Sequence, residues 1–271
     1  MRELLADKRA FASSLFLLLL CLGAASGQVV AGFGASASDW VWWMLSTRNV
    51  VWIVVSVLGV SLVLGSVAGA LVAYGPRLFS GVLGRLVELS GALPSLIIVG
   101  LWRIRDTEPD IASFIAILAA LKTIETARLV SSETERLSSQ GFVVAAYALG
   151  ASRQRVFVVH VLPHLLSALA VSSALTAASV VGLEAALSFV GLGLPGTSSW
   201  GALLGDAALG QTDWTTLSPQ PAAAAPISAT RIVLALLSVS ATTLALYTLA
   251  RAVAHRPALR TSRATPASAR A

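Results

Sequence analysis

The sequence predicts an all-α fold, a polytopic transmembrane helical bundle of about six spans. Composition is the first observation: 56% of the 271 residues are hydrophobic and 12% are charged, whereas soluble domains carry about 25% charged residues. Six apolar stretches near the length that crosses a bilayer, roughly 20 residues, are the second. These stretches lack the alternating polarity of membrane strands, so helices are expected to satisfy the backbone in lipid.

The predicted spans follow one another along most of the chain. In order they cover residues 10–30, 50–74, 86–101, 111–129, 165–187 and 232–253. Pro94 interrupts the third span, where it either kinks the helix near a translocation pathway or is simply tolerated. The expected organisation is therefore an N-terminal segment with the first span (1–30), a transmembrane domain (31–255) and a disordered cytoplasmic tail (256–271).

Basic residues gather on one side of this predicted bundle. Because Lys and Arg stay preferentially in cytoplasmic loops, the asymmetry predicts that both termini lie in the cytoplasm. It also accounts for the net charge of +6 without nucleic acid as a partner. The predicted inner side holds Arg2, Lys8, Arg9, Arg77, Arg85, Arg128, Arg136, Arg153, Arg155 and the arginines after residue 250, and the outer side holds Arg48, Arg103, Arg105 and Arg231.

The first span has a second interpretation. Basic residues, an apolar run and then Ala24-Ala25-Ser26 are also typical of a secretory signal peptide. Cleavage would leave five spans in the same orientation, so the charge pattern fits both alternatives; the retained span is favoured because more spans follow. Cys21 is the only cysteine, so an intrachain disulfide is excluded, and the bulky Leu20 before it disfavours a lipoprotein site.

The segment between the fourth and fifth spans, 128–164, carries the most informative pattern. Ala145, Ala146 and Leu149 form a small apolar surface, and Gly150 breaks or bends the helix. Ser152 is expected to cap a second helix. That helix presents an apolar stripe and is expected to end at a proline; the stripe is Val156, Phe157, Val159 and His160, and the proline is Pro163. The apolar face of such an amphipathic hairpin needs a partner, which is either lipid headgroups or a groove of another protein.

This segment resembles the EAA loop of ABC importer permeases, and more specifically their dipeptide, oligopeptide and nickel branch. AAYALGAS at 145–152 and HVLP at 160–163 stand at the family spacing. Downstream, EAALSFVGLG at 184–193 and SWG at 199–201 are similar to further elements of that branch. The chain departs from the pattern at Val144, which replaces the glutamate of the loop, and at His164, which replaces an asparagine.

The resemblance implies a permease subunit in a bacterial-type inner membrane. It would translocate peptides, nickel or other small solutes delivered by an extracytoplasmic binding protein, with a second homologous permease chain as partner. Loop 144–163 would couple to separate ATP-hydrolysing subunits, which in the family receive a short coupling helix in a cleft. The docking residues implied are Ala145, Ala146, Leu149, Gly150, Arg153, Arg155, His160, Leu162 and Pro163.

Individual residues of this loop have alternative roles. Arg153 and Arg155 either pair with acidic residues of the partner or only mark the cytoplasmic side. His160 is expected to pack or cap a helix rather than act as a base. His160 and His164 are four apart, as in zinc helices, but Pro163 separates them and no third ligand follows. No metal and no cofactor are therefore expected.

Charged and small residues within the spans are further candidates. Lys122 and Glu125, three apart on one helix face, can form a local ion pair near the inner surface. Glu184 either lines the pathway or pairs structurally. Gly65 and Gly69 form G-x-x-x-G, which lets a second helix approach closely, either inside the chain or at a subunit interface.

Two other classes of function are alternatives. A stand-alone secondary transporter or channel would be expected to show charge relays or inverted repeats, which the sequence lacks. A non-transport membrane assembly protein is the other alternative, because Val144 replaces the glutamate of the loop. The sequence contains no G-x-x-x-x-G-K-[ST] phosphate loop and no nucleophile paired with a base, so the chain is not expected to be an enzyme.

Overall fold

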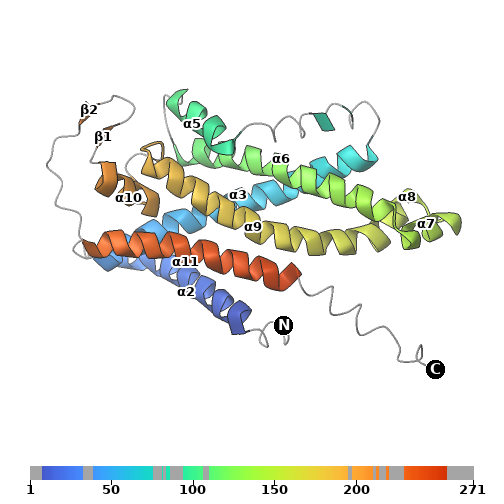
Figure 1. The fold of residues 1–271 in the computed structure, drawn as a ribbon, viewed down its shortest axis with the longest axis horizontal. Coiled ribbons are helices and arrows are strands. Elements are labelled where there is room, and N and C mark those ends of the chain that lie inside the picture. The colour runs from blue at the N-terminus through green and yellow to red at the C-terminus, as the bar shows by residue number, and fades with distance from the viewer. Residues whose placement is uncertain are drawn as a thin grey trace.

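A computed structural model describes residues 8–32, 39–75, 81, 84–85, 94–105, 110–194, 197–209, 212–213, 218–219 and 229–254. Long helices run along an elongated bundle (Figure 1), which confirms the all-α prediction. The long helices are α2 (Lys8–Gly32), α3 (Asp39–Tyr74), α6 (Ile111–Ser138), α9 (Leu162–Phe189) and α11 (Ala229–Ala254). The tail at 256–271 lies outside the described residues.

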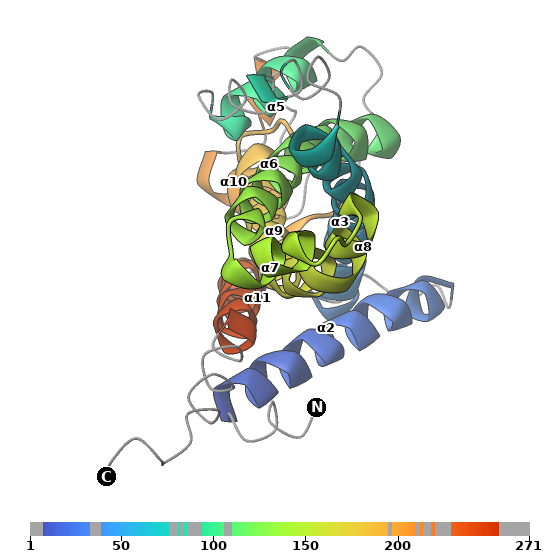
Figure 2. The same cartoon turned by 90° about the vertical axis from the view of Figure 1, so that its right-hand side faces the viewer.

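Shorter elements lie at the two ends of the bundle (Figure 1). They are α5 (Ser95–Arg105), α7 (Gly141–Ala148), α8 (Arg153–Val156), a π-helical turn (Phe157–Val161) and α10 (Trp200–Leu209). A two-residue strand β1 (Thr212–Asp213) pairs antiparallel with β2 (Ser218–Pro219). Figure 2 looks along the bundle and shows α2 crossing obliquely outside the other helices, with α7 and α8 at the near end.

Among the described residues, three continuous helical segments are long and apolar enough to cross a membrane: Asp39–Tyr74, Arg153–Phe189 and Ala229–Ala254. Within α2, Ala10–Gly23 is a shorter apolar stretch, and α6 covers the fourth predicted span but carries several charges. Residues 86–93 of the third predicted span lie outside the described residues. Its remainder is α5, which begins after Pro94, so this proline stands where its missing N–H costs no helical hydrogen bond.

Helix α3 is apolar all round, as expected of a helix that faces both lipid and protein. Its buried positions recur every three or four residues and become small toward the C-terminal half, where Ser61, Gly65 and Gly69 follow one another on one face. The opposite face exposes large side chains such as Val63 and Leu71. The helix also begins at Asp39, eleven residues before the predicted start of the span at Val50, where an acidic residue suits the helix N-terminus.

The small face of α3 packs directly on the backbone of α6. A Cβ atom added to Gly65 would lie 2.8 Å from the Thr123 carbonyl oxygen, and one added to Gly69 would lie 2.6 Å from the Ala127 carbonyl oxygen. Of the two alternatives for the G-x-x-x-G pair, the close approach occurs within the chain. In lipid there is no hydrophobic driving force for helix association, so such van der Waals contact contributes much of the stability of the α3–α6 pair.

Polar contacts fix the opposite end of α3. Arg231 at the start of α11 forms an ion pair with Asp39 at 2.6 Å. One turn further on, the Trp43 indole N–H donates to Ser238 Oγ at 2.7 Å. The start of α3 is thereby joined to α11, while its C-terminal half lies on α6.

The α3–α6 contact yields the first prediction. Gly69→Ala is expected to lower the stability of the detergent-solubilised chain by about 1–3 kcal/mol, because the added methyl group meets the Ala127 carbonyl oxygen and the stiff, β-branched side chain of Val130. Gly59→Ala is the matched control, since a Cβ there meets nothing within 4 Å. Thermal unfolding of both variants checks this, and an equal melting temperature for the two would contradict the packing account.

Candidate functional site: the loop between α6 and α9

Helix α7 ends in a turn that only glycine accommodates easily. Gly150 has φ +82°, the left-handed region that costs side-chain-bearing residues about 1–2 kcal/mol. The Gly150 N–H donates to the Tyr147 carbonyl at 2.9 Å, and the Ala151 N–H donates to the Ala146 carbonyl at 3.1 Å. These two bonds define a Schellman motif, so the predicted glycine turn is confirmed.

The second helix starts as the sequence indicates. The Ser152 backbone is extended, and its Oγ accepts the Arg155 N–H at 3.4 Å, which makes it the N-cap of α8. Local chemistry therefore sets both sides of the turn: a glycine in the left-handed conformation ends α7, and a serine hydroxyl group caps the start of α8.

The expected end of this helix at Pro163 is wrong. The helix continues through the proline to Phe189, so Arg153–Phe189 is one segment. The reason is the π-helical turn before Pro163, in which the Leu162 N–H donates to the Phe157 carbonyl five residues back. Proline lacks an N–H and its ring crowds the carbonyl four residues earlier. A wide turn at that point relieves the crowding and keeps the helix intact.

The π turn also changes which side chains face inward. The predicted stripe included Val159 and His160, but Val159 is exposed and His160 is half-buried. Val161 is buried in their place. The His160 carbonyl accepts a hydrogen bond from His164 Nδ1 at 2.9 Å, and the His164 ring stacks on Phe142.

A small apolar core lies beneath the loop and ties its pieces together. Ala146 belongs to this core and is buried, so the expectation that it forms part of the outward docking surface is wrong. The helical period explains this, since Ala146 lies three residues after the buried Val143. The core consists of Leu137 from α6, Val143 and Ala146 from α7, Val156 from α8 and Val161 from the π turn.

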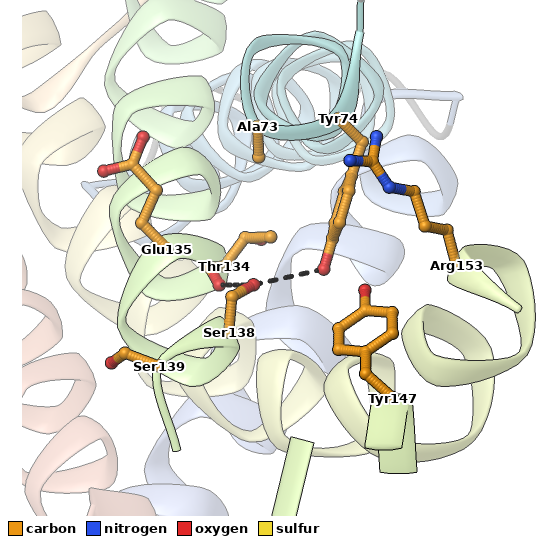
Figure 3. Close-up of a pocket in the computed structure, with 8 residues that line it drawn as sticks. All are labelled: Ala73, Tyr74, Thr134, Glu135, Ser138, Ser139, Tyr147 and Arg153. Carbon is orange, nitrogen blue, oxygen red and sulfur yellow. Dashed lines mark hydrogen bonds between the residues drawn. The ribbon is translucent and has the colours of Figure 1, made fainter. Parts of the chain in front are cut away.

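The outer face of α7 is apolar and unoccupied by any described residue. Leu149 is 88% exposed at its tip, and Val144, five residues earlier, is more than half exposed. Ala145 and Ala148 complete this surface, which we call the α7 face. Both arginines of α8 are exposed, and Arg153 also lines a cavity between α3, α6 and α7 (Figure 3).

Of the charged candidates within the bundle, Lys122 and Glu184 are buried, whereas Glu125 is about half exposed. Lys122 Nζ lies 2.8 Å from both carboxylate oxygens of Glu125, so the buried ammonium has a local ion pair. Glu184 is 2% exposed. Ser188 Oγ donates to its Oε1 at 2.7 Å, whereas Oε2 has no partner in the part of the chain that is described. Helix α10 covers this region, and added Cβ atoms at Gly201 and Gly205 would collide with α9 carbonyl oxygens.

Arg103 in α5 is a structural residue that sequence reasoning treated only as an outer-loop charge. It is 6% exposed. Its Nε donates to the Leu192 carbonyl at 3.1 Å and its Nη2 to the Gly193 carbonyl at 2.7 Å. The guanidinium also lies 5.5 Å from the centre of the Phe114 ring. Arg103 thus holds the turn after α9, and no local pattern marks it because its partners are backbone groups about ninety residues away.

The architecture is a membrane helical bundle with a helical hairpin beyond its end, and comparison with known proteins identifies its family. Residues 61–256 match the family described as binding-protein-dependent transport system inner membrane component. The chain therefore belongs to this family, a multi-pass inner-membrane component of transport systems rather than a class of enzymes. This confirms the resemblance inferred from the loop.

Individual relatives are permease proteins of oligopeptide transport systems. The oligopeptide transport system permease protein OppC of Haemophilus influenzae is 32% identical over 150 residues, which cover 55% of this chain and 48% of that protein. OppC of Lactococcus lactis subsp. cremoris is 28% identical over 179 residues, 66% of this chain and 60% of that protein. The chain thus spans about half to three fifths of the length of these relatives.

A solved structure shares the fold. An inward-facing conformation of the MetNI methionine ABC transporter superposes with a TM-score of 0.56 and 18% identity, covering 80% of this chain and 99% of that chain. At this level of identity, the match shows the arrangement of the helices.

Arg103 provides the second prediction. Arg103→Gln is expected to destabilise the chain by about 1.5–3 kcal/mol, because it removes charge-assisted bonds to two partly buried carbonyl groups. Arg105→Gln is the control, since Arg105 is exposed on the same helix. Hydrogen exchange at residues 190–194 reports the effect directly. Equal protection of that turn in the two variants would show that Arg103 does not hold it.

Proposed function

We propose that the chain is the membrane-spanning permease subunit of an ATP-driven importer, and that its α7 face docks an ATP-hydrolysing subunit. The proposal rests on the exposed apolar face of α7, which lies beyond the end of the bundle in a chain that belongs to this transport family. Both termini are assigned to the same, cytoplasmic side as this loop, as the distribution of basic residues indicates.

The α7 face has the chemistry of a small docking surface. Burying one leucine side chain contributes about 1.5–3 kcal/mol, and Leu149 is almost fully available for such burial. Ala145 and Ala148 present little bulk, so a partner's groove can approach the helix backbone closely. Arg155 stands exposed just beyond the turn and is the proposed cationic contact, while Arg153 faces the cavity instead.

The core beneath the loop supports a mechanical role. Because Val143 and Ala146 pack against residues of α6, α8 and the π turn, a displacement of α7 acts on both neighbouring helices. Since α8, the π turn and α9 form one continuous segment, the motion would pass into a spanning helix without a flexible joint. Val144, in place of the family glutamate, is exposed on the α7 face and makes this contact apolar rather than ionic.

Peptides are the proposed cargo because oligopeptide permeases are among the similar proteins; nickel or another small solute is the alternative. The proposed partners are two ATP-hydrolysing subunits or domains, a second homologous permease chain and an extracytoplasmic binding protein. Glu184 and the Lys122–Glu125 pair are proposed as pathway-lining or helix-packing groups of the assembled transporter.

The α7 face generates the third prediction. Leu149→Asp is expected to reduce co-purification of the ATP-hydrolysing subunit of the same transport system by at least about tenfold, because it places a charge in an apolar contact. Folding should be unaffected, since Leu149 is exposed. Ser132→Asp, which adds the same charge at an exposed position of α6, is the matched control.

Transport provides the second readout of the same pair of variants. In proteoliposomes with the complete system, a labelled oligopeptide should accumulate only with ATP and its binding protein, and Leu149→Asp should abolish this uptake. Undiminished co-purification in that variant would contradict docking through the α7 face. Uptake driven by an ion gradient without ATP would instead establish a secondary transporter.

A further inference from the structure

A cavity of about 640 Å³ lies where the ends of α3 and α6 meet α7 and α8, and we call it the polar cavity after the hydrogen-bonding groups on its wall. Its wall includes the hydroxyl groups of Tyr74, Ser138 and Tyr147 and the guanidinium group of Arg153. Tyr74 Oη and Ser138 Oγ are 3.3 Å apart. In Figure 3, Arg153 reaches across from α8 toward Tyr74, and the Tyr147 phenol points from α7 toward the same space.

One buried group on this wall lacks a partner. Thr134 is 1% exposed and lines the cavity, yet its Oγ1 has no hydrogen-bond partner among the described residues. Buried hydroxyl groups are almost always hydrogen-bonded, so an exception requires an explanation. Thr134 Oγ1 is enclosed by protein atoms, so a rotation of this side chain toward the cavity would let an oxygen-rich ligand provide the missing partner.

The charge of the cavity favours an anion. None of the ion pairs between described residues involves Arg153. Glu135 lies at the rim, and Figure 3 shows its carboxylate directed away from Arg153. A planar guanidinium group on the same cavity wall as several hydroxyl groups suits the oxygen atoms of a phosphate group.

An apolar groove of about 560 Å³ adjoins the polar cavity and shares Tyr74 and Arg153 with it. Val67, Leu71 and Phe157 line the groove, and Val67 and Leu71 are exposed on the lipid-facing side of α3. Because α3 ends at Tyr74, the groove lies along the last turns of a span and the polar cavity lies at the end of that span, beside Ala73 and Tyr74. Tyrosine is typical of this headgroup level.

We propose that the cavity and the groove together bind an anionic phospholipid. The phosphate group would contact Arg153 and the hydroxyl groups of Thr134 and Ser138, and an acyl chain would lie along Leu71 and Phe157. A free phosphate ion shares the headgroup chemistry, but it would leave the apolar groove empty. Since Tyr147 and Arg153 stand on either side of the Gly150 turn, the bound lipid braces the loop. This site does not depend on the proposed docking of an ATP-hydrolysing subunit.

The test measures lipid retained by the purified full-length chain in a neutral detergent, by native mass spectrometry. Phosphatidylglycerol should be retained at least about tenfold better than phosphatidylcholine, and Arg153→Gln should remove this preference. Arg155→Gln, two residues along and lining neither cavity, should retain phosphatidylglycerol fully. Thr134→Val should weaken retention while raising the melting temperature of the lipid-free chain, because it deletes an unpartnered hydroxyl group.

Two further arms distinguish a lipid from a free anion. Ala70→Phe, which fills the apolar groove, should reduce phosphatidylglycerol retention, and an excess of inorganic phosphate should displace the lipid poorly. Equal retention of the two lipids, or an unchanged preference in Arg153→Gln, would overturn the proposal. Normal retention in Ala70→Phe with complete displacement by inorganic phosphate would replace the lipid with a free anion and also overturn it.

Discussion

The rest of the structure depends on the close contact between α3 and α6. In lipid, one apolar surface gains little by leaving acyl chains for another, so helices associate where their backbones can approach. Gly65 and Gly69 provide that approach, because any larger residue would strike α6. The contact fixes the ends of both helices, and there Tyr74 of α3 lies beside Ser138 of α6 and packs edge-on against Phe157 at 5.3 Å between ring centroids. The loop is therefore placed by the glycine face of a spanning helix.

Short-range chemistry sets the conformation of the loop and makes it a rigid projection from the bundle. Gly150 closes α7 in a Schellman motif, Ser152 opens α8, and the π turn lets the helix pass Pro163 without ending. The result is one helix that carries the docking hairpin at its start and the buried Glu184 near its end. Such continuity suits a subunit whose proposed task is to transmit the closure of an ATP-hydrolysing partner to its spanning helices. It also explains why a bound lipid at the same junction would affect the loop.

The fold and part of the site could be predicted because they depend on short-range chemistry. Apolar length defined the spans, a glycine before a serine defined the turn at Gly150, and a side-chain oxygen defined the cap at Ser152. The failures share a different cause. The fate of Pro163 depends on a change of hydrogen-bond register. Which face of α7 turns inward, and with it the position of Ala146, depends on packing against α6, α8 and the π turn. The role of Arg103 depends on carbonyl groups far away in the chain, for which a single sequence contains no signal.

The central claim is that the α7 face is the contact through which the ATP-hydrolysing subunit acts on this chain. Site-specific photo-crosslinking in the assembled transporter tests it most directly, with a photoreactive residue at Leu149 and, as the control, at Leu64, an exposed leucine in the middle of α3. The account predicts a crosslink to the ATP-hydrolysing subunit from position 149 and none from position 64. No crosslink from position 149, or equal yields from both positions, would contradict it.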